Sequence, residues 1–159
     1  MTRRPKLEFP MRVPFVESLG LELVAMGDGG AELRVTLTDR HHNTWDVAHG
    51  GVVMTMLDVA MAIAARSGHP GGTAVATVEM KTSFMRPAEG QLRALGKLQH
   101  RTATLAFCEG SLFDDRGALC ATATGTFKYL RGLPARGRVT DPSLTPTPNS
   151  PTDTPEDPT

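Results

Sequence analysis

The chain has 159 residues, enough for one domain with a sizeable core. Lys plus Arg and Asp plus Glu both number 17, giving a formal net charge of zero. No overall field draws the chain to nucleic acid or to a membrane surface, so we expect neither partner. Cys108 and Cys120 lack the spacing of a metal site or a disulfide framework. We expect them to be reduced packing residues.

Residues 1–13 read as a charged N-terminal arm without the apolar segment of a secretory signal. The apolar run at 52–65 is shorter than the roughly 20 residues that a membrane span needs. We therefore expect a cytoplasmic protein. Residues 131–159 are rich in Pro and Thr and poor in large apolar side chains, which is typical of a disordered tail. The domain is expected between residues 14 and 130.

Helical and strand patterns alternate in a simple order within this domain. PFVESLG (14–20) predicts a short helix entered through a proline, and residues 21–37 predict a hairpin around Gly27–Gly30. A polar loop (38–48) leads to a long apolar helix over 52–66, which Ser67, Gly68 and Pro70 end.

Beyond the helix the apolar period changes to two. Strands are expected over 73–85, 91–100, 104–113 and 119–130, and their short connections make them antiparallel neighbours. The pattern predicts an α+β fold in which a curved antiparallel sheet of about six strands wraps one long central helix. Because that helix is apolar on nearly all sides, it must be covered on nearly all sides, partly by a second subunit.

Asp58 interrupts the apolar helix and needs an explanation, since a buried lone carboxylate is costly. It could be a hydrogen-bonded structural acid, or it could lie on a narrow wet strip. Gly50 and Gly51, however, open the same helix, where the first amides are unpaired and the dipole is positive. Glycines let a ligand approach this backbone closely. Such a terminus suits a developing oxyanion, and together with a carboxylate it suggests acyl hydrolysis.

Gly50 and Asp58 cannot serve one acyl carbon within a single chain. The eight residues between them span about 12 Å of helix and about 80° of rotation. Two antiparallel helices about a two-fold axis would bring Gly50 of one chain near Asp58 of the other. We therefore expect a homodimer with shared active sites.

A group of residues matches the sequence motifs of one enzyme family. Asn43, His49-Gly50-Gly51, Asp58 and the stretch VEMKTSFMRPAEG are similar to the hotdog-fold acyl-CoA thioesterases of the PaaI-like (phenylacetic acid degradation) type. The resemblance covers about residues 14–130. It implies hydrolysis of acyl-CoA by a homodimer, commonly paired into a homotetramer, with no metal and no cofactor beyond the CoA of the substrate.

The resemblance also implies roles for catalytic residues. The Gly50 amide would polarise the thioester carbonyl, and Asp58 would act as general base on water or as nucleophile. Asn43 would orient the substrate or the water. His49 would position the loop or hydrogen-bond near the thioester. Thr77 matches a hydroxyl that holds the water, but strict alternation places it on the face of Glu79 and Lys81 unless a bulge or an interface position intervenes.

Substrate-binding candidates are less specific. Gly51 would allow close approach of the substrate, and Trp45 would line the acyl pocket or anchor its loop. The CoA phosphates need cations, for which Arg86, Lys97, Arg101 and Lys128 are candidates. His41, His42, His69 and His100 lack metal-ligand spacing and are expected at loops or edges.

Two other functions remain open. The chain could bind acyl-CoA without hydrolysing it, as a sensor or carrier, although such a protein has no need of Asp58. It could also be a hydratase or dehydratase of the same fold. Those enzymes pair an acid with a histidine on one element, and the helix of Asp58 has no such histidine.

Overall fold

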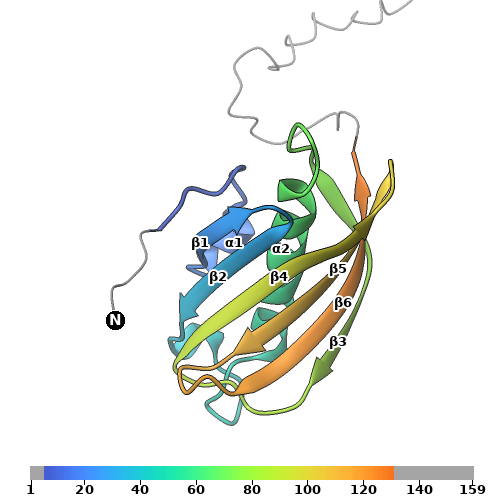
Figure 1. Ribbon diagram of the computed structural model, residues 1–159. Coiled ribbons are helices and arrows are strands. Elements are labelled where there is room, and N and C mark those ends of the chain that lie inside the picture. Colours follow the sequence, from blue (N-terminus) through green and yellow to red (C-terminus); the bar gives the residue numbers. More distant parts are fainter. Residues whose placement is uncertain (1–5, 131–159) are drawn as a thin grey trace, which may run out of the picture.

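The computed structural model describes residues 6–130, and in it a six-stranded antiparallel sheet curves around one long helix (Figure 1). Residues 1–5 and the whole predicted tail lie outside the described residues. The elements in chain order are α1 (Pro14–Ser18), β1 (Glu22–Gly27), β2 (Gly30–Thr36), η1 (Asp39–His41), α2 (Gly50–Ser67), β3 (Val75–Phe84), β4 (Gln91–Arg101), β5 (Leu105–Phe113) and β6 (Leu119–Tyr129). The predicted α+β architecture is confirmed.

The strand order β1-β2-β4-β5-β6-β3 places β1 and β3 at the two edges of the sheet. Helix α2 contacts all six strands. It begins at Gly50 rather than Val52, so both glycines of the HGG sequence belong to its first turn. The loop over 38–48 contains the short helix η1, which the sequence did not indicate.

Small residues in the sheet let α2 approach closely. Gly96 on β4 and Gly110 on β5 lie directly opposite each other in the register. A Cβ at Gly96 would collide with the backbone of Ala60, and one at Gly110 would press on Leu57 and Met61. The absence of these side chains seats the helix in the concave face, because a packed interior tolerates no such overlap.

One stripe of α2 is not covered by the sheet within a single chain, and this is the part of the helix for which the sequence analysis expected a second subunit. Met54 is exposed, and Thr55, Asp58 and Ala62 are half-buried along the same side. By length and composition the helix could cross a membrane, with 18 residues and a mean hydropathy of 1.3. Half of it is buried inside the protein, as is typical of a core helix.

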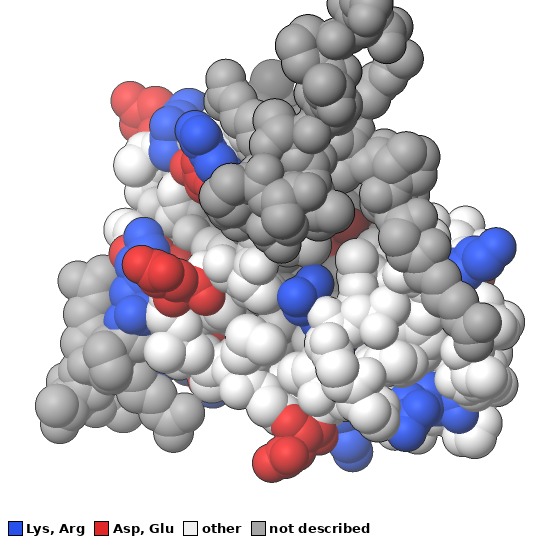
Figure 2. Space-filling view, turned by 90° about the horizontal axis from the view of Figure 1, so that it is seen from above, with Lys and Arg blue, Asp and Glu red and all other residues white. Residues whose placement is uncertain are grey.

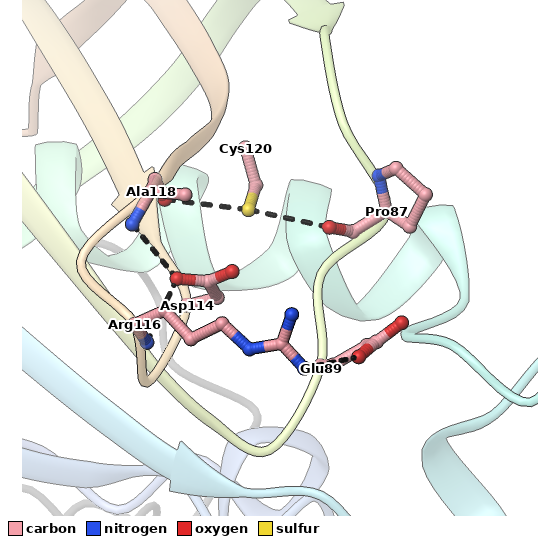
Figure 3. A network of polar contacts seen from close by, with 6 residues as sticks. All are labelled: Pro87, Glu89, Asp114, Arg116, Ala118 and Cys120. Atoms are coloured by element: carbon pink, nitrogen blue, oxygen red, sulfur yellow. Dashed lines mark hydrogen bonds and ion pairs between the residues drawn. The ribbon is translucent and has the colours of Figure 1, made fainter.

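A polar network supports the loop that precedes α2 (Figure 3). Asp114 Oδ1 accepts the backbone amides of Arg116 and Ala118, closing the β5–β6 turn. The Cys120 thiol lies 3.4 Å from the carbonyl oxygens of Pro87 and Ala118, which ties this turn to the β3–β4 loop. Next to Pro87, the Ala88 carbonyl accepts the amide of Ala48, immediately before His49. The network therefore fixes the entry to the helix.

Both cysteines are free and buried, as predicted. Burial raises the pKa of Cys108 to about 12, so this thiol stays protonated at neutral pH. Residues 7–13, which the sequence interpretation set apart as an arm, contact the folded body. Leu7 bridges to Leu23 on β1, and Phe9 packs against the core.

Candidate active site

Asp58 and Thr77 meet in the structure. The Thr77 hydroxyl on β3 donates a hydrogen bond of 2.7 Å to Asp58 Oδ1. Asp58 is half-buried on the uncovered stripe of α2, so it is neither a fully buried structural acid nor an ordinary surface residue. Within residues 6–130, the Thr77 hydroxyl is the one hydrogen-bond donor to the Asp58 carboxylate.

A β-bulge explains why Thr77 faces the helix. Thr77 pairs with Phe127, a fully buried residue on the inner face, whereas Glu79 pairs with Thr126 and accepts its hydroxyl on the outer face. The register shifts between Thr77 and Glu79, with Val78 as the extra residue. Directly paired residues share a face. Thr77 and Glu79 therefore point to opposite faces, and the strict alternation assumed from the sequence was wrong here.

The surroundings of Asp58 change its acidity. Burial raises the pKa of its carboxyl above the ordinary value of 3.8, because desolvation disfavours the charged form. The hydrogen bond from Thr77 opposes this by stabilising the carboxylate. A carboxylate with a raised pKa is a stronger base than a solvated one, provided that it remains ionised at the working pH.

The helix N-terminus has one amide free. His49 is the N-cap, and its Nδ1 accepts the amide of Gly51 at 2.9 Å. Because Nδ1 accepts, the proton of the neutral ring is on Nε2, which can donate outward. The amide of Gly50 has no hydrogen-bond partner within the part of the chain that the structure describes. Gly50 can therefore donate to a ligand oxygen, whereas the Gly51 amide is already bonded.

Phe84 adds a group that the sequence did not point to. Its ring, at the end of β3, lies about 3.5 Å from where a Cβ of Gly50 would be. The side chain is nevertheless 54% exposed. A Cβ at position 50 would only touch this ring in ordinary van der Waals contact, so Phe84 forms an apolar wall beside the free amide.

Asn43 and Trp45 belong to the turn before the helix. The side-chain oxygen of Asn43 accepts the amide of Trp45 at 2.8 Å, and the Asn43 amide donates to the Val47 carbonyl. Asn43 thus shapes the loop, and its side-chain NH2 group has no hydrogen-bond partner among residues 6–130. The Trp45 side chain is 81% exposed among residues 6–130, so it is not packed as a loop anchor there.

A pocket of about 270 Å³ opens beside Asp58 and Thr77. Its apolar walls come from the N-terminal arm and from α2: Phe9, Met11, Val13, Val59, Ala62 and Ile63. The sequence interpretation missed the contribution of the arm. The available signal was the alternation of Leu7, Phe9, Met11 and Val13 with polar residues or proline, which is typical of a half-buried extended segment.

The candidate cations for CoA do not form one cluster. Arg86, in the β3–β4 loop, donates to the Leu119 carbonyl at 2.7 Å. Arg101 ends β4, an 11-residue strand about 33 Å long, so the two arginines lie at opposite ends of it. Lys97 and Lys128 are exposed on β4 and β6. On the face seen in Figure 2, basic side chains likewise form separate spots.

The histidines outside the HGG sequence do not belong to the Asp58–Thr77 pair or to the start of α2. His41 lies in the 38–48 loop, as predicted, but is almost fully buried: its Nδ1 accepts the amide of Thr38 and its Nε2 contacts the Leu19 carbonyl. His69 packs on Tyr129, and His100 lies near Phe107. Across residues 6–130, no three His, Cys, Asp or Glu side chains are arranged to hold a metal ion.

Comparisons with known proteins point to one family. The family model of the thioesterase superfamily matches residues 46–121, from the turn before α2 into β6. A Halobacterium salinarum protein, named as a candidate esterase, is 31% identical over 125 residues, covering 71% of this chain and 82% of the relative. The proofreading thioesterase EntH of Cronobacter turicensis is 26% identical over 109 residues, covering 68% and 80%.

A solved structure agrees with these sequence relatives. The phenylacetic acid degradation-related protein of Ralstonia eutropha, described as a candidate thioesterase, superposes with a TM-score of 0.67. It is 31% identical, and the match covers 74% of this chain and 92% of that one. The fold is thus shared with that structure over most of both chains. The chain belongs to the thioesterase superfamily, as a hydrolase of the PaaI-like type with the hotdog fold.

Proposed function

We propose that the protein hydrolyses acyl-CoA thioesters to free acid and CoA, in active sites shared between two chains. The observation that carries the proposal is the Asp58–Thr77 pair, a desolvated carboxylate held by a hydroxyl on the uncovered stripe of α2. In the same chain, the unpaired Gly50 amide lies about 12 Å away along the helix. A second copy, packed antiparallel, would supply the missing half of each site.

The chemistry follows from these groups. The Gly50 amide donates to the thioester carbonyl oxygen and stabilises the charge that develops on it. The partner's Asp58 takes a proton from water, whose oxygen attacks the carbonyl carbon. The tetrahedral intermediate then expels the CoA sulfur, which leaves as thiolate and is protonated. In the alternative route, Asp58 of the partner subunit attacks directly, and water hydrolyses the resulting anhydride.

Other residues support this geometry. Thr77 orients the carboxylate and keeps part of it ionised. The Nε2 proton of His49 and the side-chain NH2 group of Asn43 are free to contact substrate near the Gly50 amide. Arg86 lies two residues after Phe84, whose ring is beside Gly50, so we assign it to CoA phosphate binding ahead of Arg101.

The test is release of CoA thiol from short, medium and aromatic acyl-CoAs, by the wild type and by Asp58→Asn. We expect the substitution to lower turnover by about 10² or more, the scale of losing an acid–base group. Asp28→Asn, in the β1–β2 turn, is a matched control and should turn over like the wild type. Near-normal turnover by Asp58→Asn would remove Asp58 from the mechanism. Tight acyl-CoA binding without release by the wild type would support a sensor or carrier instead.

Thermal unfolding separates a catalytic from a structural role. Since the folded state raises the pKa of Asp58 above 3.8, folding favours its protonated form, and the ionised group costs stability at higher pH. Asp58→Asn should therefore melt at or above the wild-type temperature at pH 7. Below pH 3.8 the wild-type carboxyl is protonated in both states, so this difference should vanish.

A further inference from the structure

The pocket beside Asp58 has a charge at its far end. One end holds the Asp58–Thr77 pair, the walls are apolar, and Arg66 is its one basic lining residue. Asp58, Ala62 and Arg66 follow one another at four-residue spacing, so they share a face of α2. An acyl group whose carbonyl carbon lies at Asp58 would extend along this face toward Arg66.

The guanidinium of Arg66 is poorly paired. Its Nη1 lies 3.4 Å from the Met11 sulfur, and a thioether is a weak acceptor. No carboxylate lies within ion-pair distance of Arg66 among residues 6–130. By contrast, Arg12, the neighbour of Met11, is paired with Glu17 at 3.3 Å. An arginine with free donors beside an apolar pocket can bind a carboxylate through two parallel hydrogen bonds, displacing the sulfur.

We infer that this pocket takes a short acyl group whose far end carries an acceptor oxygen, best a carboxylate, bound by Arg66. The inference rests on the proposed thioesterase function and specifies its substrate class. The size of the pocket agrees: about 270 Å³ is below the range of about 300–1,000 Å³ typical of drug-sized ligands. The eight residues from Asp58 to Arg66 span about 12 Å of helix, and the long arginine side chain leans back toward Asp58.

The N-terminal arm completes the recognition site. The Met11 sulfur contacts the Arg66 guanidinium, and Phe9 and Val13 form the apolar wall opposite α2. The substrate is therefore enclosed between the arm and the helix. Its middle is apolar and its far end polar, as in a thioester of a dicarboxylic acid.

The experiment compares CoA thioesters of equal carbon number with and without a terminal carboxylate, namely succinyl with butyryl and adipyl with hexanoyl. For the wild type we expect a higher kcat/KM for the dicarboxylic member of at least one pair. In Arg66→Met, which keeps an apolar stem, the ratio of dicarboxylic to monocarboxylic kcat/KM should fall about tenfold or more. Arg66→Lys keeps the charge without the planar fork, so its ratio should lie between the two.

Arg12→Met is the matched control, since it removes one positive charge from the arm without touching the pocket. It should leave the ratio at the wild-type value. A wild-type preference for the monocarboxylic members, or a ratio that does not respond to Arg66→Met in a folded protein, would overturn the inference while the thioesterase function stands. Absence of thiol release from all four substrates, and from the wider acyl-CoA series, would overturn both.

Discussion

The two edge strands of the sheet differ in whether their outer edge is covered. β1 has six residues, and its carbonyl at Leu23 accepts a hydrogen bond from the Leu7 amide of the N-terminal arm; a register shift occurs in both edge strands. β3 has ten residues, and no strand or arm within residues 6–130 pairs with its outer edge. Figure 1 shows β3 open at one side, whereas the N-terminal segment runs beside β1. Open edges invite pairing, and proteins usually shorten, bulge or cover them.

The open edge is also where the candidate site lies. β3 carries Thr77, the 58% exposed Val78 and Phe84. The Thr82 hydroxyl on the same strand is buried without a hydrogen-bond partner, the one such side chain in the described part of the protein. This hydroxyl is enclosed within one chain, so a second copy would not reach it. From the open edge and the exposed Val78, we propose that a second copy covers β3 and the uncovered stripe of α2, whereas the chain itself closes the edge at β1.

A charge on the open edge should have the largest effect. Val78→Lys would place a cation in the proposed interface, so we expect a monomer by light scattering and a loss of turnover of about 10² or more, because neither site would be complete. Met26→Lys, on the exposed part of β1, should keep the wild-type oligomer mass in light scattering and the wild-type turnover. An unchanged mass for Val78→Lys would place the interface elsewhere.

Mixing two inactive variants tests whether the site is shared. Asp58→Asn lacks the carboxylate, and Gly50→Pro lacks the amide donor. A heterodimer of the two has one doubly damaged site and one in which an intact Gly50 meets an intact Asp58. Subunit exchange should restore activity, up to half per heterodimer. If the Gly50→Pro protein melts at the wild-type temperature, a verified heterodimer without recovered activity would argue that both residues serve one chain.

The fold and the outline of the site could be predicted from sequence because they depend on local patterns. Gly50 and Asp58 stand out by residue type alone, and the two periods of apolar residues define the helix and the strands. The direction of Thr77 depends on one extra residue, Val78, whose effect appears only in the pairing with β6. Likewise, Phe84 reaches Gly50 and Met11 reaches Arg66 through contacts distant in sequence, which periodicity cannot reveal.

Removing the Thr77 hydroxyl should have a moderate effect on rate and a specific one on pH dependence. The hydrogen bond lowers the pKa of Asp58, so Thr77→Val should raise it. Since the ionised carboxylate is the active form, the rising limb of the pH–rate profile should move to higher pH, with about tenfold lower turnover at pH 7. Thr77→Ser keeps a hydroxyl and should retain the wild-type profile. A profile that does not move in Thr77→Val would show that the hydroxyl does not control this carboxylate.

The smallest effect is expected at the closed edge. Leu7→Pro removes the amide that donates to the Leu23 carbonyl at 2.8 Å, while Leu7→Ala keeps the amide and loses only part of an exposed side chain. One hydrogen bond contributes about 1 kcal/mol to the free energy of unfolding, which corresponds to about 2–4 °C in Tm for a chain of this size. We expect that shift for the proline variant and a smaller one for alanine. Turnover and mass should stay close to wild type in both, because Leu7 contacts neither β3 nor Asp58. A larger oligomer mass for Leu7→Pro would mean that β1, once uncovered, pairs with another chain as readily as β3. The difference between the two edges would then depend on the N-terminal arm alone.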